Sequence, residues 1–267
     1  MSSALRRSRV PAVLTWATML FFYVPIVLLV VNSFNANRQG TIWHGFTFQW
    51  YVDLFTSPKG RDIWRALSNT LLVATVATVI STVIGTSAAF ALHKYKTAFQ
   101  KYHYFLIYTP LVVPEILIGT SLLLFFAAIH VQLSFWTVVL AHVTFCISYV
   151  AMAVLARLQD FDMTILEAAR DLGASSWTTT WRVLVPIILP GIFAGALLAF
   201  TLSIDDFVIT FFVKGPGTMT LPIQIQGMIK RGSLSLINAL STLLLAVTFL
   251  AILIYQMVMR RHRKEEP

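Results

Sequence analysis

The chain has 267 residues, of which 57% are hydrophobic and 12% charged, and its formal net charge is +9. Soluble globular domains carry about 25% charged residues. The composition therefore argues against a soluble enzyme or binding domain. It also argues against a nucleic-acid-binding protein, because no soluble domain is available to present a basic face.

Six stretches are apolar enough to cross a bilayer as helices, which takes about 20 residues each. Their interiors contain no Lys or Arg. This pattern predicts an all-α integral membrane protein with one transmembrane domain over 1–267. The expected spans are approximately 12–31, 66–92, 104–129, 135–156, 187–213 and 236–259.

The first span follows Arg6, Arg7 and Arg9, as a signal peptide would. Its apolar run is longer than a signal core, and no small-residue cleavage site follows, so a retained signal anchor is the better interpretation. With the N-terminus inside, most of the 20 Lys and Arg residues fall in inside segments. The positive-inside rule then predicts that both termini are cytoplasmic.

Two long loops, 32–65 and 214–235, are expected on the outer side. The outer loops carry several aromatic residues, whose role has two interpretations. They are anchors at the membrane interface, or they form a docking surface for an external partner. The residues in question are Trp43, Trp50, Tyr51 and Trp64.

Three carboxylates lie inside predicted spans: Glu115, Asp205 and Asp206. A charge near the bilayer centre costs on the order of 3 kcal/mol, so such residues face the bundle interior or a wet cavity. Glu115 follows Pro110 and Pro114, which are expected to kink the third span. Three acids without a nearby Lys or Arg favour passage of a cation. The alternative is that they are buried structural acids, hydrogen-bonded or protonated.

Small residues at four-residue spacing predict close helix packing on two spans. Successive helical residues point about 100° apart. Asp206 therefore falls within the stripe of the fifth span, which runs through Ser203, and Asp205 points about 100° away from the centre of that stripe. We expect Asp206 to find a partner on a neighbouring helix and Asp205 to face a cavity, or the reverse if the helix unwinds. The stripes are Ser81, Gly85 and Ala89, and Gly191, Gly195, Ala199 and Ser203.

The fourth span contains His142 and the single cysteine, Cys146. His142 is expected to form hydrogen bonds between helices, in preference to a proton relay. One cysteine forms neither an internal disulfide nor a metal cluster, so Cys146 is expected to be a packing residue.

The longest inside loop, 157–186, is too polar to span and has its own pattern. Thr164 and Glu167 have the spacing of a capping box, and Asp162 is an alternative cap. A helix is predicted over about 165–172, ending at Gly173 in the left-handed conformation. Ser175 or Ser176 would cap a second short helix, which Pro186 limits.

The sequence Glu167-Ala168-Ala169, followed by Gly173 and then Val183-Leu-Val-Pro186, resembles the EAA loop of binding-protein-dependent ABC importer permeases. The family form ends in Ile-x-Leu-Pro, so both aliphatic positions differ here. Further segments resemble the second permease of spermidine/putrescine importers. They are Asn32-Ser-Phe-Asn35, Gly45-Phe-Thr-Phe-Gln-Trp-Tyr51, His142-Val-Thr-Phe-Cys146, Ala199-Phe-Thr-Leu-Ser-Ile-Asp-Asp206 and Gly215-Pro216.

The resemblance implies the six-helix type I ABC importer (MetI-like) fold, with a cytoplasmic coupling helix that docks on an ATPase. It implies a heterodimer with a second permease, two ATPase subunits, a periplasmic binding protein and a polyamine substrate, in the bacterial inner membrane. The coupling residues would be Glu167, Ala168, Ala169, Asp171 and Gly173. The chain lacks the Gly-x-x-x-x-Gly-Lys-Ser/Thr phosphate loop, so it is expected to be no enzyme and to hold no cofactor, with ATP and Mg²⁺ bound by the partner.

Other classes remain as alternatives. An ATP-independent secondary transporter would use Glu115, Asp205 and His142 for ion coupling. A membrane scaffold would not require acids in its spans. A membrane enzyme is the least favoured class, because no nucleophile–base pair is visible. Within the importer class, another small amine or organic solute is an alternative to a polyamine.

Overall fold

A computed structural model describes residues 10–40, 42–95, 98–159, 161–162 and 164–265. The basic residues Arg6, Arg7, Arg9 and Lys96, which entered the orientation argument, lie outside the described residues. Every long element in the described part of the chain is a helix. Within it, five helices are long and apolar enough to cross a membrane, and there are six such spans if a bent pair of shorter helices is counted as one.

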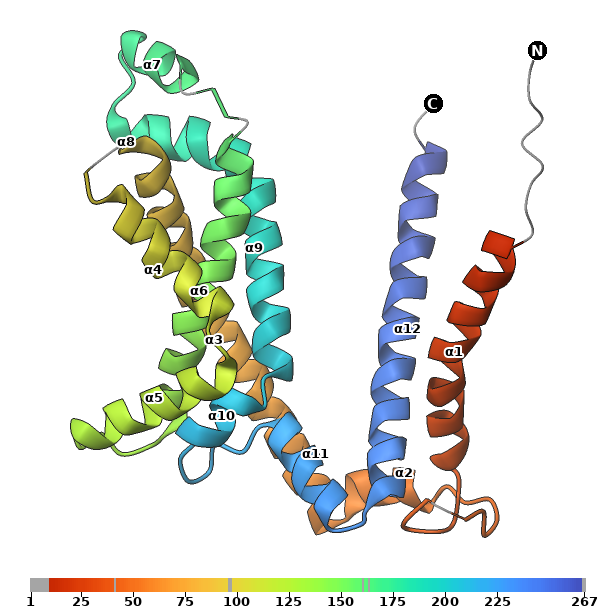
Figure 1. Ribbon diagram of the computed structural model, residues 1–267. Helices are drawn as coiled ribbons and strands as arrows, with labels where there is room; N and C mark the ends of the chain where they lie inside the picture. The colour runs from red at the N-terminus through yellow and green to blue at the C-terminus, as the bar shows by residue number, and fades with distance from the viewer. Residues whose placement is uncertain (1–9, 41, 96–97, 160, 163, 266–267) are drawn as a thin grey trace. The chain divides into compact units, whose positions relative to one another are not determined.

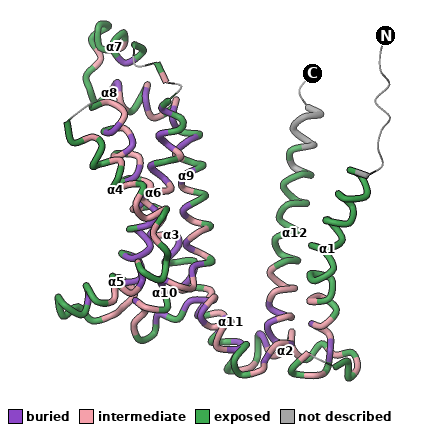
Figure 2. The backbone as a smooth tube through the Cα atoms, in the orientation of Figure 1, coloured by how far each residue is buried: buried purple, intermediate pink, exposed green. Residues whose placement is uncertain are grey.

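The chain divides into two compact units. The terminal unit comprises Met1–Ile63 and Ile225–Pro267, and the central unit comprises Trp64–Gln224. In the terminal unit, α1 (Val10–Asn32) contacts α12 (Leu234–Glu265), which also contacts α2 (Gln49–Thr56) (Figure 1). The described residues of α1 are exposed over nearly their whole length (Figure 2). An apolar helix exposed on all sides is suited to lipid or to a partner helix.

The outer loop of the terminal unit is built on its own aromatic residues. Trp50 donates its Nε1–H to the carbonyl of Asn35 at 2.7 Å. The Tyr51 hydroxyl lies 2.6 Å from the Ser33 hydroxyl, and the Phe34 and Phe46 rings stack with centroids 5.1 Å apart. Trp50 and Tyr51, two of the aromatic residues of this loop, thus stabilise the conformation of the loop through hydrogen bonds within it.

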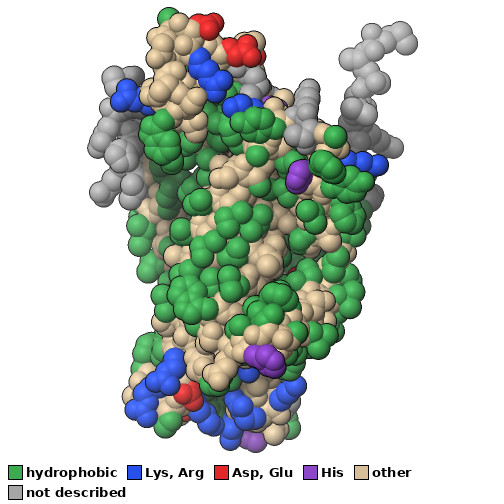
Figure 3. All heavy atoms as spheres, turned by 90° about the vertical axis from the view of Figure 1, so that its left-hand side faces the viewer, with side chains coloured by type: hydrophobic (Ala, Val, Ile, Leu, Met, Phe, Trp, Pro, Cys, Tyr) green, Lys and Arg blue, Asp and Glu red, His purple; other side chains and the backbone are tan. Residues whose placement is uncertain are grey.

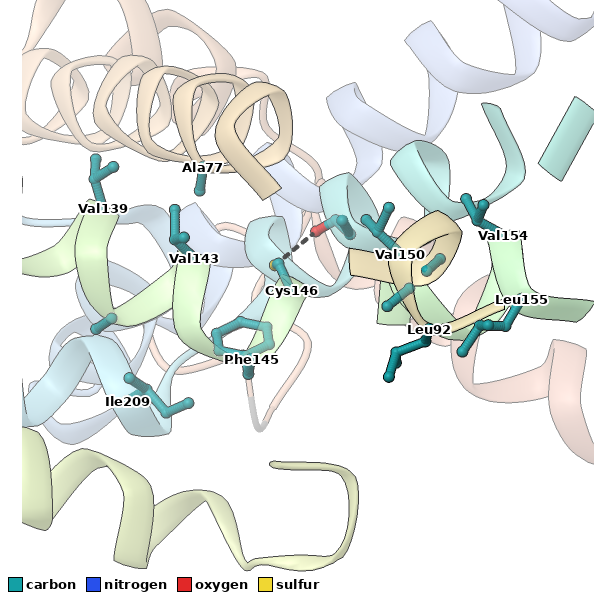
Figure 4. Close-up of a cluster of buried hydrophobic side chains, with 14 of the residues drawn as sticks. Ala77, Leu92, Val139, Val143, Phe145, Cys146, Val150, Val154, Leu155 and Ile209 are labelled. Carbon is teal, nitrogen blue, oxygen red and sulfur yellow. Dashed lines mark hydrogen bonds between the residues drawn. The ribbon is translucent and has the colours of Figure 1, made fainter. Parts of the chain in front are cut away.

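The central unit contains most of the remaining helices, and its core lies along α6 (Phe135–Gln159). One face of α6 packs against α9 (Val185–Asp205), and the apolar core also includes residues of α3 (Pro58–Lys94). Figure 4 shows this core, with Ala77 of α3 near Val139 and Val143. Cys146 is fully buried there and its thiol donates to the Ala199 carbonyl at 3.5 Å, which confirms its packing role.

Both small-residue stripes are confirmed as close-packing faces against α6. A Cβ added at Gly85 would lie 2.8 Å from Cβ of Val150, and one at Gly195 would lie 3.0 Å from Cα of the same residue. Val150 therefore contacts two helices at glycine positions, where an added methyl group would crowd it. The spacing of the small residues predicts the close approach, and the structure adds that α6 is the partner helix.

The third predicted span differs from a single kinked helix. It consists of α4 (Gln100–Val112) and α5 (Glu115–Ala128), which are bent by 108°. Pro114 precedes Glu115 and has extended backbone angles, φ −56° and ψ 135°. The residue before a proline is also disfavoured in the helical conformation, so the chain leaves the helix at Val113 and restarts at Glu115.

The fifth predicted span also differs, because its helix ends at Asp205. Asp206 adopts extended angles, φ −61° and ψ 121°, and a separate short helix, α10 (Val208–Val213), follows. A Cβ on Gly119 of α5 would lie 2.8 Å from the Phe212 ring of α10. The segment expected to complete the span instead turns to pack against α5 and α6.

A glycine substitution tests the packing of α3 on α6. Gly85→Ala should lower the free energy of unfolding by about 1–3 kcal/mol, the usual cost of overpacking, because its Cβ meets Val150 and the Ile147 carbonyl. Gly227→Ala is the matched control, since the atom nearest its Cβ is the flexible end of Arg231 at 3.4 Å. Thermal unfolding of the purified protein in detergent should show a lower melting temperature for Gly85→Ala and an unchanged melting temperature for Gly227→Ala. Equal melting temperatures would contradict the close packing.

Candidate functional site

The loop between α6 and α9 begins with α7 (Thr164–Asp171). The Asp162 side chain accepts a hydrogen bond from the backbone N–H of Thr164 at 2.9 Å. Asp162, one of the two residues predicted to cap this helix, thus caps its N-terminus. Hydrogen bonds from the Thr164 backbone and side chain hold the pKa of the Asp162 carboxyl below its usual value.

Gly173 ends α7 as predicted, with φ +86°. The Gly173 N–H donates to the Arg170 carbonyl at 2.8 Å and the Ala174 N–H donates to the Ala169 carbonyl at 3.1 Å. These two bonds form a Schellman motif, which satisfies the last carbonyls of the helix. The turn directs the chain into α8 (Ser176–Thr179), where Ser175 caps the helix by accepting from the Thr178 N–H at 3.2 Å.

The side chains of α7 divide into one buried anchor and an exposed surface. Leu166 is 5% exposed and belongs to the apolar core of the central unit. The predicted coupling residues Glu167, Ala168 and Asp171 are exposed and Ala169 is half-buried. Figure 3 shows charged side chains of both signs at the top and at the bottom of the face it draws, and hydrophobic side chains over its middle.

Exposed apolar side chains accompany these coupling residues on the same loop. Leu172 is 89% exposed and Trp177 is 72% exposed. The Trp177 and Trp181 rings contact each other with centroids 5.4 Å apart. Large apolar side chains grouped in this way are typical of protein interaction sites.

The second loop helix does not stop at Pro186, contrary to the prediction. Ser176–Asp205 forms one helical run of 30 residues, with a π-helical turn, η1 (Thr180–Leu184), in place of a break. The Val185 N–H donates to the Thr180 carbonyl, five residues back. This wider turn precedes Pro186, so the missing N–H of the proline does not end the helix. One continuous helix therefore joins the loop to Asp205.

The other end of this helix opens on an acidic cavity of about 160 Å³. Glu115 and Asp205, which line it, are both exposed, whereas Asp206 is 9% exposed. Phe145 and Tyr149, one turn apart on α6, complete the lining with Leu202. The structure thus brings the three predicted carboxylates together, and none of the residues lining the cavity is a Lys or Arg.

Asp206 has the buried partner on a neighbouring helix that the stripe predicts. Its Oδ2 lies 3.2 Å from Nε2 of His142 on α6 and accepts from the Thr210 hydroxyl at 2.7 Å. Nδ1 of His142 lies 2.6 Å from the Ser203 hydroxyl of α9. His142 therefore bonds between helices, as predicted.

The prediction from sequence missed Phe145 and Tyr149 as cavity residues. They follow His142 at positions +3 and +7 on the same helix, a spacing that puts them on one face. That spacing is the signal that could have found them. Among the described residues, no group of three or more His, Cys, Asp or Glu side chains could hold a metal ion.

A multi-pass helical fold, an exposed loop helix and an acidic cavity define a membrane transport subunit. A family model described as "Binding-protein-dependent transport system inner membrane component" matches residues 81–264. The chain belongs to this family, and it is a multi-pass inner-membrane protein.

Two curated relatives match over most of the chain. The spermidine/putrescine transport system permease protein PotC of Escherichia coli (strain K12) is 36% identical over 244 residues, which cover 91% of each chain. The putrescine transport system permease protein PotI of the same strain is 38% identical over 253 residues, which cover 92% of this chain and 89% of the relative.

Solved structures confirm the predicted type of fold. A bacterial ABC transporter involved in the import of the acidic polysaccharide alginate has a TM-score of 0.71 at 16% identity, over 97% of this chain and 99% of that chain. An amino acid ABC transporter with histidines has a TM-score of 0.52 at 21% identity, over 79% of this chain and 95% of that chain. At these identities the likeness establishes the fold of an ABC importer permease and nothing about the solute.

Proposed function

We propose that this chain is the permease subunit of an ABC importer that moves a polyamine, spermidine or putrescine, into the cytoplasm. The observation that carries the proposal is the acidic cavity formed by Glu115, Asp205 and Asp206 with two aromatic rings. Carboxylates and aromatic faces both attract ammonium groups. The names of the PotC and PotI relatives support the same class of substrate.

The substrate path passes the cavity, where Glu115 and Asp205 present exposed carboxylates and Asp206 completes the acidic lining. A polyamine brings several ammonium groups joined by short methylene chains. The carboxylates of the cavity would bind the ammonium groups. The Phe145 and Tyr149 rings would bind the ammonium groups through cation–π contacts and the methylene chains through apolar contacts. An anionic solute would be repelled by the same lining.

Coupling to ATP takes place through the loop helix α7. Its exposed surface of Glu167, Ala168 and Asp171 docks in a groove on a cytoplasmic ATPase, and Gly173 gives the turn that joins α7 to the long helix. The continuous run 176–205 connects that surface to Asp205. A displacement of α7 is thus transmitted along one rigid element to the cavity.

The working assembly is a heterodimer with a second permease, two ATPase subunits that bind ATP and Mg²⁺, and a periplasmic binding protein. The loop with α7 lies on the cytoplasmic side, and both termini do as well. The excess of basic residues in these segments supports this orientation. This chain contributes no hydrolytic residue and no cofactor of its own.

Purification of the tagged chain from native membranes tests the proposal. The ATPase subunit and a second permease should co-purify, and the ATPase activity of the complex should rise when spermidine-loaded binding protein is added. Recovery of the chain without any ATPase would instead support the ion-coupled secondary transporter. Stimulation only by a different solute would keep the importer and reject the polyamine.

A further inference from the structure

A buried polar network ties the end of α9 to α6 and α10. At its centre is the His142 side chain, which is 1% exposed. Its Nε2 lies 3.2 Å from Oδ2 of Asp206 and 2.8 Å from the Thr210 hydroxyl. Its Nδ1 lies 2.6 Å from the Ser203 hydroxyl. One imidazole ring therefore contacts the last turn of α9, the residue after it and the first turn of α10.

The Asp206 carboxylate accepts hydrogen bonds on both oxygens from within the protein. The N–H groups of Ile209 and Thr210 donate to Oδ1 at 3.2 Å and to Oδ2 at 2.8 Å. The Thr210 hydroxyl donates to Oδ2 at 2.7 Å, and His142 completes the set. Because these donors surround the carboxylate, Asp206 is the least available of the three acids for a substrate.

The adjacent acid has the opposite environment. Asp205 is exposed, is the last residue of α9, and lines the cavity with Glu115. Among the described residues, neither Asp205 nor Glu115 forms an ion pair with a Lys or Arg side chain, whereas Asp206 has the His142 ring 3.2 Å away. Both aspartates line the cavity, but Asp205 presents an exposed carboxylate to it, whereas Asp206 is 9% exposed and held by hydrogen bonds within the protein.

We propose that His142 is a positioning residue for substrate binding. By holding Asp206 against α10, it fixes the end of α9 after Asp205 and aims the Asp205 carboxylate into the cavity beside Glu115. Asp206 then acts through the backbone and does not bind the solute. This inference rests on the proposed function for its substrate, but its geometric part does not depend on which solute is carried.

Two substitutions separate the bonds of His142. In His142→Gln, the side-chain amide nitrogen takes the place of Nε2 and keeps a donor toward Asp206. In His142→Asn, the amide nitrogen takes the place of Nδ1, so the bond toward Asp206 is lost. Spermidine uptake by the complete importer in cells should show a KM close to wild type for the Gln variant. The KM should be about tenfold higher for the Asn variant, because an Asp205 carboxylate that is no longer held toward the cavity loses about one charge-assisted hydrogen bond to the substrate.

A second readout is independent of the solute. In a Cys146→Ser background, Asp205→Cys should react quickly with a positively charged, membrane-impermeant methanethiosulfonate in the assembled importer. The reaction rate should stay unchanged with His142→Gln and fall several-fold with His142→Asn. Equal rates and equal KM values for the two His142 variants would overturn the positioning role. If neither the wild type nor any variant transports spermidine, the proposed function fails. The labelling rates still test the positioning role of His142 in that case.

If His142→Asn does not accumulate in the membrane, a second pair tests the same network. Thr210→Val removes the hydroxyl between His142 and Asp206 at nearly constant volume, and Thr210→Ser keeps it. We expect a raised KM for spermidine and slower labelling of Asp205→Cys with Thr210→Val, and neither change with Thr210→Ser. Identical behaviour of the Val and Ser variants would overturn it.

Discussion

Neutralising the exposed acids of the cavity should weaken substrate binding. Glu115→Gln and Asp205→Asn should each raise the KM for spermidine uptake by about tenfold, which corresponds to the loss of one charge-assisted hydrogen bond of about 1.4 kcal/mol. Both side chains are exposed in the cavity, so neither change leaves a buried group unpaired. The double variant should show uptake near background.

Charge-preserving variants provide the control for this prediction. Glu115→Asp and Asp205→Glu keep the carboxylates and should retain most of the uptake. Uptake of radiolabelled spermidine at several concentrations, together with substrate-stimulated ATPase activity, separates KM from the maximal rate. Wild-type values of both quantities in Glu115→Gln and in Asp205→Asn would remove these residues from the substrate path.

A bulky side chain on the loop helix should abolish transport without unfolding the chain. Ala168 is exposed on α7, so the ring of Ala168→Phe has room within this protein. On the proposed docking of α7 to the ATPase, the ring would, however, hold α7 away from the partner surface. We expect at least a tenfold loss of uptake and of ATPase co-purification, equivalent to about 1.4 kcal/mol or more of docking free energy.

Ala168→Ser is the matched control, because it keeps the side chain small at the same position. It should retain both uptake and the bound ATPase. The amount of each variant in the membrane and its melting temperature should be those of the wild type. Full transport by Ala168→Phe at normal membrane levels would show that α7 is not the docking helix.

The sequence was sufficient to predict the features that depend on local chemistry. Long apolar runs without Lys or Arg predict the spans, because unpaired charge is costly in lipid. Gly173 follows a short helix-forming segment and adopts the left-handed conformation that glycine favours. The stripe through Ser203 predicts the face of α9 that packs on α6. In each case the signal lies within a few neighbouring residues.

The remaining features depend on contacts distant in the sequence. His142 bonds Ser203 and Thr210, which are 61 and 68 residues away, and no local pattern specifies these partners. Their packing also decides that α9 ends at Asp205, within an apolar run that would otherwise continue the helix. Pro114 permits a break but does not fix its angle, and Pro186 is accommodated by a π-helical turn that the proline rule does not predict.

The most direct test of the account is transport in proteoliposomes that contain this chain with its second permease and ATPase subunits. With ATP and Mg²⁺ on the ATPase side and spermidine-loaded binding protein on the other, radiolabelled spermidine should cross the membrane without an ion gradient. The same vesicles with Glu115→Gln and Asp205→Asn combined should transport near background. Spermidine transport that needs an ion gradient and proceeds without ATP would contradict the account.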